Sequence, residues 1–221
     1  MYSDFPELLI FSKRDMVFSF IQVDTNGLCL RKPHYQSLLR GCDLLGVPLD
    51  GGTREMNDRL RGREGHFMIV LGLLEDLGQL HLPLKVNTVV CRENIRDLLN
   101  LEIILGKYPI KLWSLYEFWG IGPAADHVAR FSIPTADFLD AVQAIAARAR
   151  SLNVGIGAVS ERRQSYFFVS HSGRAYTVDR TDSSKYFSLG SVFDADILEK
   201  WQTNVEATAD PRLARRVASV R

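Results

Sequence analysis

The sequence contains little cysteine: Cys29, Cys42 and Cys91 are the only three in 221 residues. An odd number at wide spacing excludes a disulfide framework, and no CxxC or CxxxCxxC motif occurs. The five histidines are scattered, without an HxxxH or HExxH pair. We therefore expect reduced, mostly buried thiols and no metal site built from this chain alone.

Two other features are missing: a strong net charge and a long apolar run. The formal net charge is +1 at pH 7, which argues against a nucleic-acid partner. No apolar run is long enough to span a bilayer. The first residues, MYSDFPELLIFSKRD, carry acids early and do not form a cleavable signal. These observations predict no membrane partner and, by default, a cytoplasmic location.

What the sequence does contain is a regular alternation of strand-like and helix-like segments. Apolar runs at 18–23, 43–49, 84–90 and 111–118 predict buried strands, and helical periodicity fills the intervals between them. Such alternation is typical of parallel βα units. A closed eight-fold barrel needs about 250 residues. We therefore predict an α/β fold, a partial (βα) barrel or open sheet of about four parallel strands, with residues 18–23 at a free edge.

The C-terminal third changes character and predicts a small β-rich extension. Strands are expected at 165–169, 175–178 and 186–192, with a hairpin turn at His171–Gly173. Polar residues that can cap helices are Thr53, Asn94 and Thr135. The predicted division is a partial barrel over 1–130, a C-terminal helix and β-hairpin extension over 131–202, and a polar tail over 203–221 that we expect to be disordered.

Polar residues lie at or near the ends of three successive predicted strands. They are Thr25, Asn26, Asp50, Asn87 and Thr88. Ligands of open parallel sheets bind at the carboxyl ends of the strands, so these side chains are candidates for one shared cleft. The alternative is turn chemistry, because Asn, Asp and Gly tolerate left-handed backbone.

The order of these segments is more specific than any one of them. VDTNG, then PLDGGTREMNDRLRGREGHF, then LKVNTVVCRENIRDL, then IKLWSLYEF resembles the later half of a radical SAM domain over roughly 18–118. Residues 131–201 resemble the C-terminal extension of the branch that includes viperin-like nucleotide dehydratases and molybdenum-cofactor cyclase relatives.

This resemblance implies roles for single residues. Thr25, Asn26 and Asn87 match positions near S-adenosylmethionine (SAM), and Arg61 matches a basic position that meets the SAM carboxylate. Lys85 matches a lysine that binds substrate phosphate, and Trp113 and Tyr116 lie on the strand that faces substrate in the W-x-x-Y-x-F pattern. The plainer alternatives are a solvated helix-end arginine for Arg61 and a strand-edge lysine for Lys85. No residue is assigned as catalytic or as a metal ligand.

Several features depart from the family pattern. Pro48 replaces the serine of S-L-D-G, which removes a hydrogen bond to SAM, and Leu112 and Ser114 replace basic residues of the viperin-like branch, which argues against a triphosphate substrate. The family's CxxxCxxC loop, which holds a [4Fe–4S] cluster, and its G-G-E-P strand are both absent from the 221 residues. Residues 4–9 resemble the helix that follows G-G-E-P. We therefore expect no cluster in this chain alone and only weak SAM binding.

Three functions remain open. The first is the C-terminal part of a SAM-dependent radical enzyme acting on a small molecule, inactive alone or paired with a separate N-terminal radical SAM half. The second is a non-catalytic binding or interaction module on a half-barrel. The third is a small α/β protein that binds a phosphorylated ligand. Without the cluster cysteines, the sequence leaves open whether this chain alone is an enzyme.

Overall fold

The fold was analysed in a computed structural model that describes residues 4–16, 18–162, 166–179, 182 and 184–205, with side chains to 203. The chain forms two compact units. The first comprises residues 1–116 and 134–156, and the second comprises 117–133 and 157–221. Each unit is described by itself.

The first unit is built on a five-stranded parallel sheet whose spatial order follows the sequence. Its strands are β1 (Gln22–Asp24), β2 (Leu44–Pro48), β3 (Leu84–Val90), β4 (Ile110–Glu117) and β5 (Val154–Gly157). The predicted parallel arrangement is confirmed, with one strand more than expected. β1 pairs only with β2 among the described strands and is therefore the edge that the sequence predicted.

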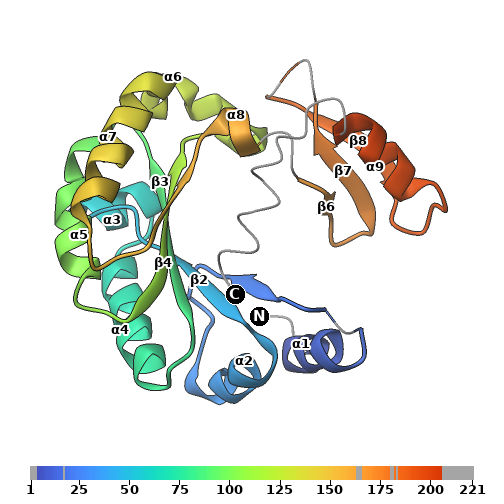
Figure 1. The fold of residues 1–221 in the computed structure, drawn as a ribbon, viewed down its shortest axis with the longest axis horizontal. Coiled ribbons are helices and arrows are strands. Elements are labelled where there is room, and N and C mark those ends of the chain that lie inside the picture. Colours follow the sequence, from blue (N-terminus) through green and yellow to red (C-terminus); the bar gives the residue numbers. More distant parts are fainter. Residues whose placement is uncertain (1–3, 17, 163–165, 180–181, 183, 206–221) are drawn as a thin grey trace. The chain divides into compact units, whose positions relative to one another are not determined.

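Helices of the first unit lie along one side of this sheet (Figure 1). They are α1 (Phe5–Arg14), α2 (Tyr35–Gly41), α3 (Arg54–Arg61), α4 (His66–Gln79), α5 (Leu98–Leu105) and α7 (Thr135–Arg148), with short 3-10 turns η1 (Lys32–His34) and η2 (Ile95–Asp97). Leu45, Val47 and Val86 of the strands and Leu74 and Leu77 of α4 are fully buried. The hydrophobic core therefore lies between sheet and helices.

Two of the three predicted helix caps differ from the structure. Thr53 caps α3 as expected, because its hydroxyl accepts a hydrogen bond from the Met56 N–H at 3.2 Å. Thr135 is already the first residue of α7, which follows Pro134, and makes no side-chain cap. Asn94 caps nothing either, since its side chain bonds to neighbouring loops instead.

The first predicted strand, 18–23, is shorter and lies later than expected. β1 begins only at Gln22. Just before it, the Ile21 N–H donates to the Asp43 carboxylate at 2.7 Å, and the Asp43 N–H donates back to the Ile21 carbonyl. A side chain thus takes the place of a strand partner at this position.

The second unit contains a small antiparallel sheet in the order β6-β7-β8. Its elements are η3 (Gly122–His127), α6 (Val128–Phe131), α8 (Val159–Arg162), β6 (Phe168–Val169), β7 (Arg174–Val178), β8 (Tyr186–Ser191) and α9 (Ile197–Val205). Ala175, Leu189 and Ile197 form its buried core, with Trp201 packed against them. The predicted hairpin turn is present, with Gly173 at a φ of 75°.

The observed units do not follow the predicted boundary at residue 130. Helix α7 and strand β5 extend the parallel sheet, so residues 134–156 belong to the first unit. Helix α9 continues to Val205, which places the first residues of the predicted tail in a helix. Residues 206–221 lie outside the described part of the chain. None of the described helices is long and apolar enough to cross a membrane.

Candidate functional site

The two faces of the parallel sheet have different chemistry. Side chains alternate between faces along a strand, and parallel partners in register share a face. Trp113 and Thr88 point toward the helices, where the Trp113 indole N–H donates to the Thr88 hydroxyl at 2.9 Å. Both residues have an exposed fraction of 0%. Alternation therefore turns both side chains into the core of this structure, away from the face that carries Lys85, whereas the sequence placed them at a ligand. The substrate role of Trp113 stays a prediction.

The opposite face, which we call the inner face, carries a group of polar residues. Asp24 of β1 is in register with Gly46 of β2, and Gly46 with Lys85 of β3. Asn87 follows two residues after Lys85 on the same face, and Tyr116 of β4 contacts Lys85. We call Asp24, Gly46, Lys85, Asn87 and Tyr116 the inner-face cluster. Lys85, Asn87 and Tyr116 were predicted site residues, and the structure brings them together.

A hydrogen bond crosses the central strand of this cluster. The Asn87 amide donates to the Asp24 carboxylate at 2.7 Å, from β3 to β1 over Gly46 of β2. A Cβ atom at Gly46 would overlap the Asp24 carboxylate and lie 2.9 Å from the Asn87 amide nitrogen. Only glycine therefore permits the bridge. The other amide atom, Asn87 Oδ1, is buried and has no hydrogen-bond partner among the described residues.

Lys85 is a buried cation in the same cluster. Its exposed fraction is 6%. The ammonium donates to the Tyr116 hydroxyl at 3.0 Å and lies 5.5 Å from the centre of that ring. No carboxylate in the described part of the chain forms an ion pair with it. A buried ammonium without a counter-charge is costly unless an anion compensates it.

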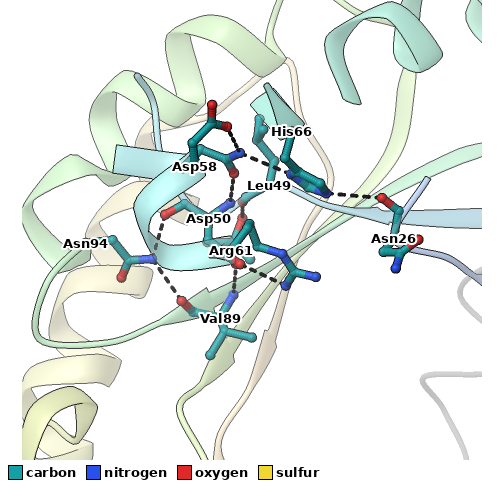
Figure 2. Close-up of polar contacts among 10 residues, drawn as sticks. Asn26, Leu49, Asp50, Asp58, Arg61, His66, Val89 and Asn94 are labelled. Atoms are coloured by element: carbon teal, nitrogen blue, oxygen red, sulfur yellow. Dashed lines mark hydrogen bonds and ion pairs between the residues drawn. The ribbon is translucent and has the colours of Figure 1, made fainter. Parts of the chain in front are cut away.

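A second polar group joins the carboxyl ends of β1, β2 and β3 (Figure 2). We call Asp50, Asn57, Arg61, His66 and Asn94 the carboxyl-end network. The Asp50 carboxylate accepts from the Val89 N–H at 2.8 Å and from Arg61 at 3.2 Å. Asn94 donates to the Asp50 carbonyl at 2.8 Å and to the Val89 carbonyl at 2.9 Å.

His66 extends this network to the loop after β1. The Asn57 amide nitrogen, which can only donate, lies 3.1 Å from His66 Nδ1, so Nδ1 accepts. The second ring nitrogen, Nε2, lies 3.1 Å from the Asn26 carbonyl and carries the proton. The imidazole is therefore neutral. Burial lowers the pKa of His66, which agrees with this assignment.

The predicted SAM contacts at this end already have partners within the chain. The Thr25 hydroxyl accepts from the Gly27 N–H and the Asn26 side chain from the Leu28 N–H, both at 3.1 Å. This is the turn chemistry that the sequence left as the alternative. Arg61 forms an ion pair with Asp50. Burial raises the pKa of Asp50 above its usual value, and Arg61 offsets only part of that increase. Asp50 is enclosed in the network and does not face a cleft.

The cysteines do not form a cluster site. Cys29 is exposed, whereas Cys42 and Cys91 are buried. Burial raises the pKa of both buried thiols, which disfavours the thiolates that iron requires. The described residues contain no group of three His, Cys, Asp or Glu side chains that could hold a metal ion. The side chains of the described residues thus do not fit a [4Fe–4S] cluster.

Sequence reasoning missed two residues that matter here. Asp24 stands directly before Thr25, and strand alternation over Gln22–Asp24 was the signal that places it on the inner face. His66 was treated as one of five scattered histidines. Its partners Asn26 and Asn57 lie 40 and 9 residues away in sequence, and no spacing motif connects them.

Comparison with known proteins establishes the fold. No family model and no curated protein matches the sequence. Among solved structures, the chain is similar to anSMEcpe with bound AdoMet (16% identity, TM-score 0.64, covering 90% of this chain and 61% of that chain). It is also similar to Streptococcus suis SuiB bound to S-adenosylmethionine (16%, 0.57, 71% and 35%). A third is a domain of pyruvate-formate lyase-activating enzyme from Bacteroides vulgatus (16%, 0.54, 69% and 91%).

The five-stranded parallel sheet with its helices and the small C-terminal sheet therefore have the fold of these solved structures. The chain spans about a third of the length of SuiB and about three fifths of anSMEcpe. At 16% identity this likeness concerns the fold alone.

Proposed function

We propose that this chain supplies the SAM- and substrate-facing strands of a SAM-dependent radical enzyme. The observation that carries the proposal is the inner-face cluster. On β3, the described residues give the Lys85 ammonium no carboxylate and the buried Asn87 amide oxygen no donor. Unsatisfied buried groups are rare, and each calls for an explanation such as a functional role or a bound water or ion; here we assign a ligand. They lie on a fold whose solved relatives include complexes with SAM.

The residues present fit SAM and a small anionic substrate. Asn87 Oδ1 can accept a hydrogen bond from a hydroxyl or amino group of the ligand, and the exposed Asp24 carboxylate can accept a second one. Lys85, which donates a hydrogen bond to Tyr116, provides the positive charge that binds a carboxylate or phosphate. SAM, when reduced by an iron–sulfur cluster, supplies radical chemistry. The residues of this chain bind and orient the reactants.

The cluster itself is proposed to come from residues other than these 221, on a separate N-terminal radical SAM half. The placement of the three cysteines supports this, and this chain alone is then inactive. The order of the sequence motifs supports the viperin-like or molybdenum-cofactor cyclase-like branch, and the cytoplasmic location stays a prediction. The same cysteine placement also favours the second candidate, a non-catalytic binding module that has kept the half-barrel.

Two measurements on the full chain test the proposal. In calorimetric titration, SAM should bind weakly, with a Kd of about 1 mM, because a few hydrogen bonds at about 0.5–1.5 kcal/mol each barely offset immobilisation of the ligand. Asn87→Ala should weaken this binding, and Glu102→Gln, on the helix side, should not. Anaerobic reconstitution with iron and sulfide should yield no cluster.

Three outcomes would contradict it. Absence of SAM binding at 10-fold the expected Kd would remove the SAM site. Equal binding by wild type and Asn87→Ala would place SAM elsewhere on the chain. A reconstituted brown protein that cleaves SAM when reduced would show that the chain needs no cluster-bearing partner.

A further inference from the structure

The second unit contains a groove that the proposed function does not use. β8 is an edge strand of the three-stranded sheet, and α9 packs beside it (Figure 1). Between them lies a groove of about 590 Å³, lined by β8 residues 187–190 and by a polar stripe of α9 and the turn before it. All of these residues belong to one unit.

The floor of the groove exposes a backbone edge. The Asp179 N–H donates to the Lys185 carbonyl at 2.9 Å, which sets the alternation of the β7–β8 pair. Residue 187 therefore directs its N–H and C=O groups toward β7. Ser188, in register with Tyr176, directs them away from β7, and Ser188 is one of the residues that line the groove. An outward row of this kind pairs with another extended backbone.

The wall of the groove is acidic. Asp196, Glu199 and Lys200 face it at helical spacing. The Lys200 ammonium lies 3.0 Å from Asp196 and 4.0 Å from Asp194, so its charge is already compensated. Glu199 is left without a cation among the described residues. Beside it, the Phe187 ring is 42% exposed and offers an apolar contact.

We propose that this groove binds an extended peptide of another protein as a fourth strand on β8. The exposed backbone edge selects an extended polypeptide rather than a small molecule. The acidic wall selects a lysine or arginine on the side chain that faces Glu199, and Phe187 selects an apolar residue near it. An acidic peptide would meet like charge on the same wall.

The proposal can be tested by selecting peptides on the immobilised full chain. A phage-displayed library of random decapeptides should yield sequences that alternate, with Lys or Arg enriched on one side. A synthetic peptide of the selected sequence should bind Ser188→Pro at least 10-fold more weakly, because proline removes the outward N–H without breaking a bond to β7. Glu199→Lys should weaken it at least fivefold.

Matched variants control for damage to the unit. Ser188→Ala keeps the backbone donor, and Leu198→Ala changes an exposed residue of α9 outside the groove; both should bind as wild type does. Circular dichroism should show Ser188→Pro folded. Full affinity of folded Ser188→Pro, or selection of acidic peptides, would overturn the proposal. A dimer in light scattering that Ser188→Pro abolishes would assign the groove to a second copy of the chain instead.

Discussion

The carboxyl-end network joins the ends of β1, β2 and β3, and the inner-face cluster lies on β1 to β4. The two groups differ in how their polar atoms are satisfied. In the network, Asp50 receives a backbone N–H and a guanidinium, and His66 has a partner on each ring nitrogen. In the cluster, Lys85 has a neutral hydroxyl for a partner, and Asn87 Oδ1 has none among the described residues.

This difference assigns different roles to the two groups. A satisfied buried network stabilises the ends of the strands and leaves nothing for a ligand. An incompletely satisfied cluster lowers stability, and such positions are retained where function needs them. Removal of the buried charge should therefore lower stability in the network, at Asp50, and not in the cluster, at Lys85. Four predictions on the free energy of unfolding follow from this contrast and from the geometry of the two groups.

The largest loss is expected for Asp50→Ala. It leaves the Val89 N–H without its acceptor and Arg61 without its counter-charge, and breaking a buried pair costs about 3–5 kcal/mol. Urea denaturation measures the loss. The control is Glu102→Gln, which breaks a pair with the exposed Arg148 and should cost less than about 1 kcal/mol. Equal losses would show that the Asp50–Arg61 pair contributes no more to stability than an exposed ion pair does.

A smaller loss is expected for Gly46→Ala. The new methyl group overlaps the Asp24 carboxylate and separates it from Asn87. The exposed Asp24 side chain can move aside, so the cost is that of the lost hydrogen bond, about 0.5–1.5 kcal/mol. Gly72→Ala is the matched control, because nothing lies within 4 Å of a Cβ there and Gly72 is inside α4. That variant should gain about 0.5–1 kcal/mol. A stabilised Gly46→Ala protein would refute the bridge over β2.

The contrast between these groups also shows what a sequence can predict. Apolar runs and helical periodicity gave the strand order correctly, because burial of one face is a local pattern. The pairing of Asn87 with Asp24 spans 63 residues and that of Asp50 with Val89 spans 39, and local patterns do not encode such distances. The sequence identifies the polar residues at the strand ends. Whether they stabilise the fold or face a ligand depends on their hydrogen-bond partners, which the sequence does not show.

Trp113 shows the same limit of sequence-based prediction for a buried residue. Its motif suggested a substrate contact, whereas its register turns it into the core beside Thr88. A shift of one residue along a strand exchanges the two faces. The motif predicts which residues form the strand, but the face to which each side chain points depends on how that strand pairs with its neighbours.

A pH-dependent loss is expected from His66. Its folded pKa is lowered from the usual 6.5, so the unfolded chain binds the proton more readily. The stabilising contribution is complete above pH 6.5 and is lost as the pH falls toward the folded pKa, at about 1.4 kcal/mol for each unit of lowering. His66→Gln keeps one acceptor and one donor without titrating. Thermal melts between pH 7.5 and 5.5 should show a smaller decline for that variant, and parallel declines would contradict the assignment.

The smallest effect on stability is expected for Lys85→Met, and this variant separates the two groups of residues most clearly. Methionine fills similar volume and removes a buried ammonium that has no carboxylate partner in the described part of the chain, so the free energy of unfolding should stay the same or rise. Urea denaturation tests this, with Asp50→Ala as the comparison. Tyr116 is only partly buried, so its hydroxyl can bond to water in place of the lysine. A loss of more than about 2 kcal/mol, in the range of breaking a compensated buried charge, would show that Lys85 is part of the structural framework. The inner-face cluster would then stabilise the fold as the carboxyl-end network does, and Lys85 would not be a site for an anion.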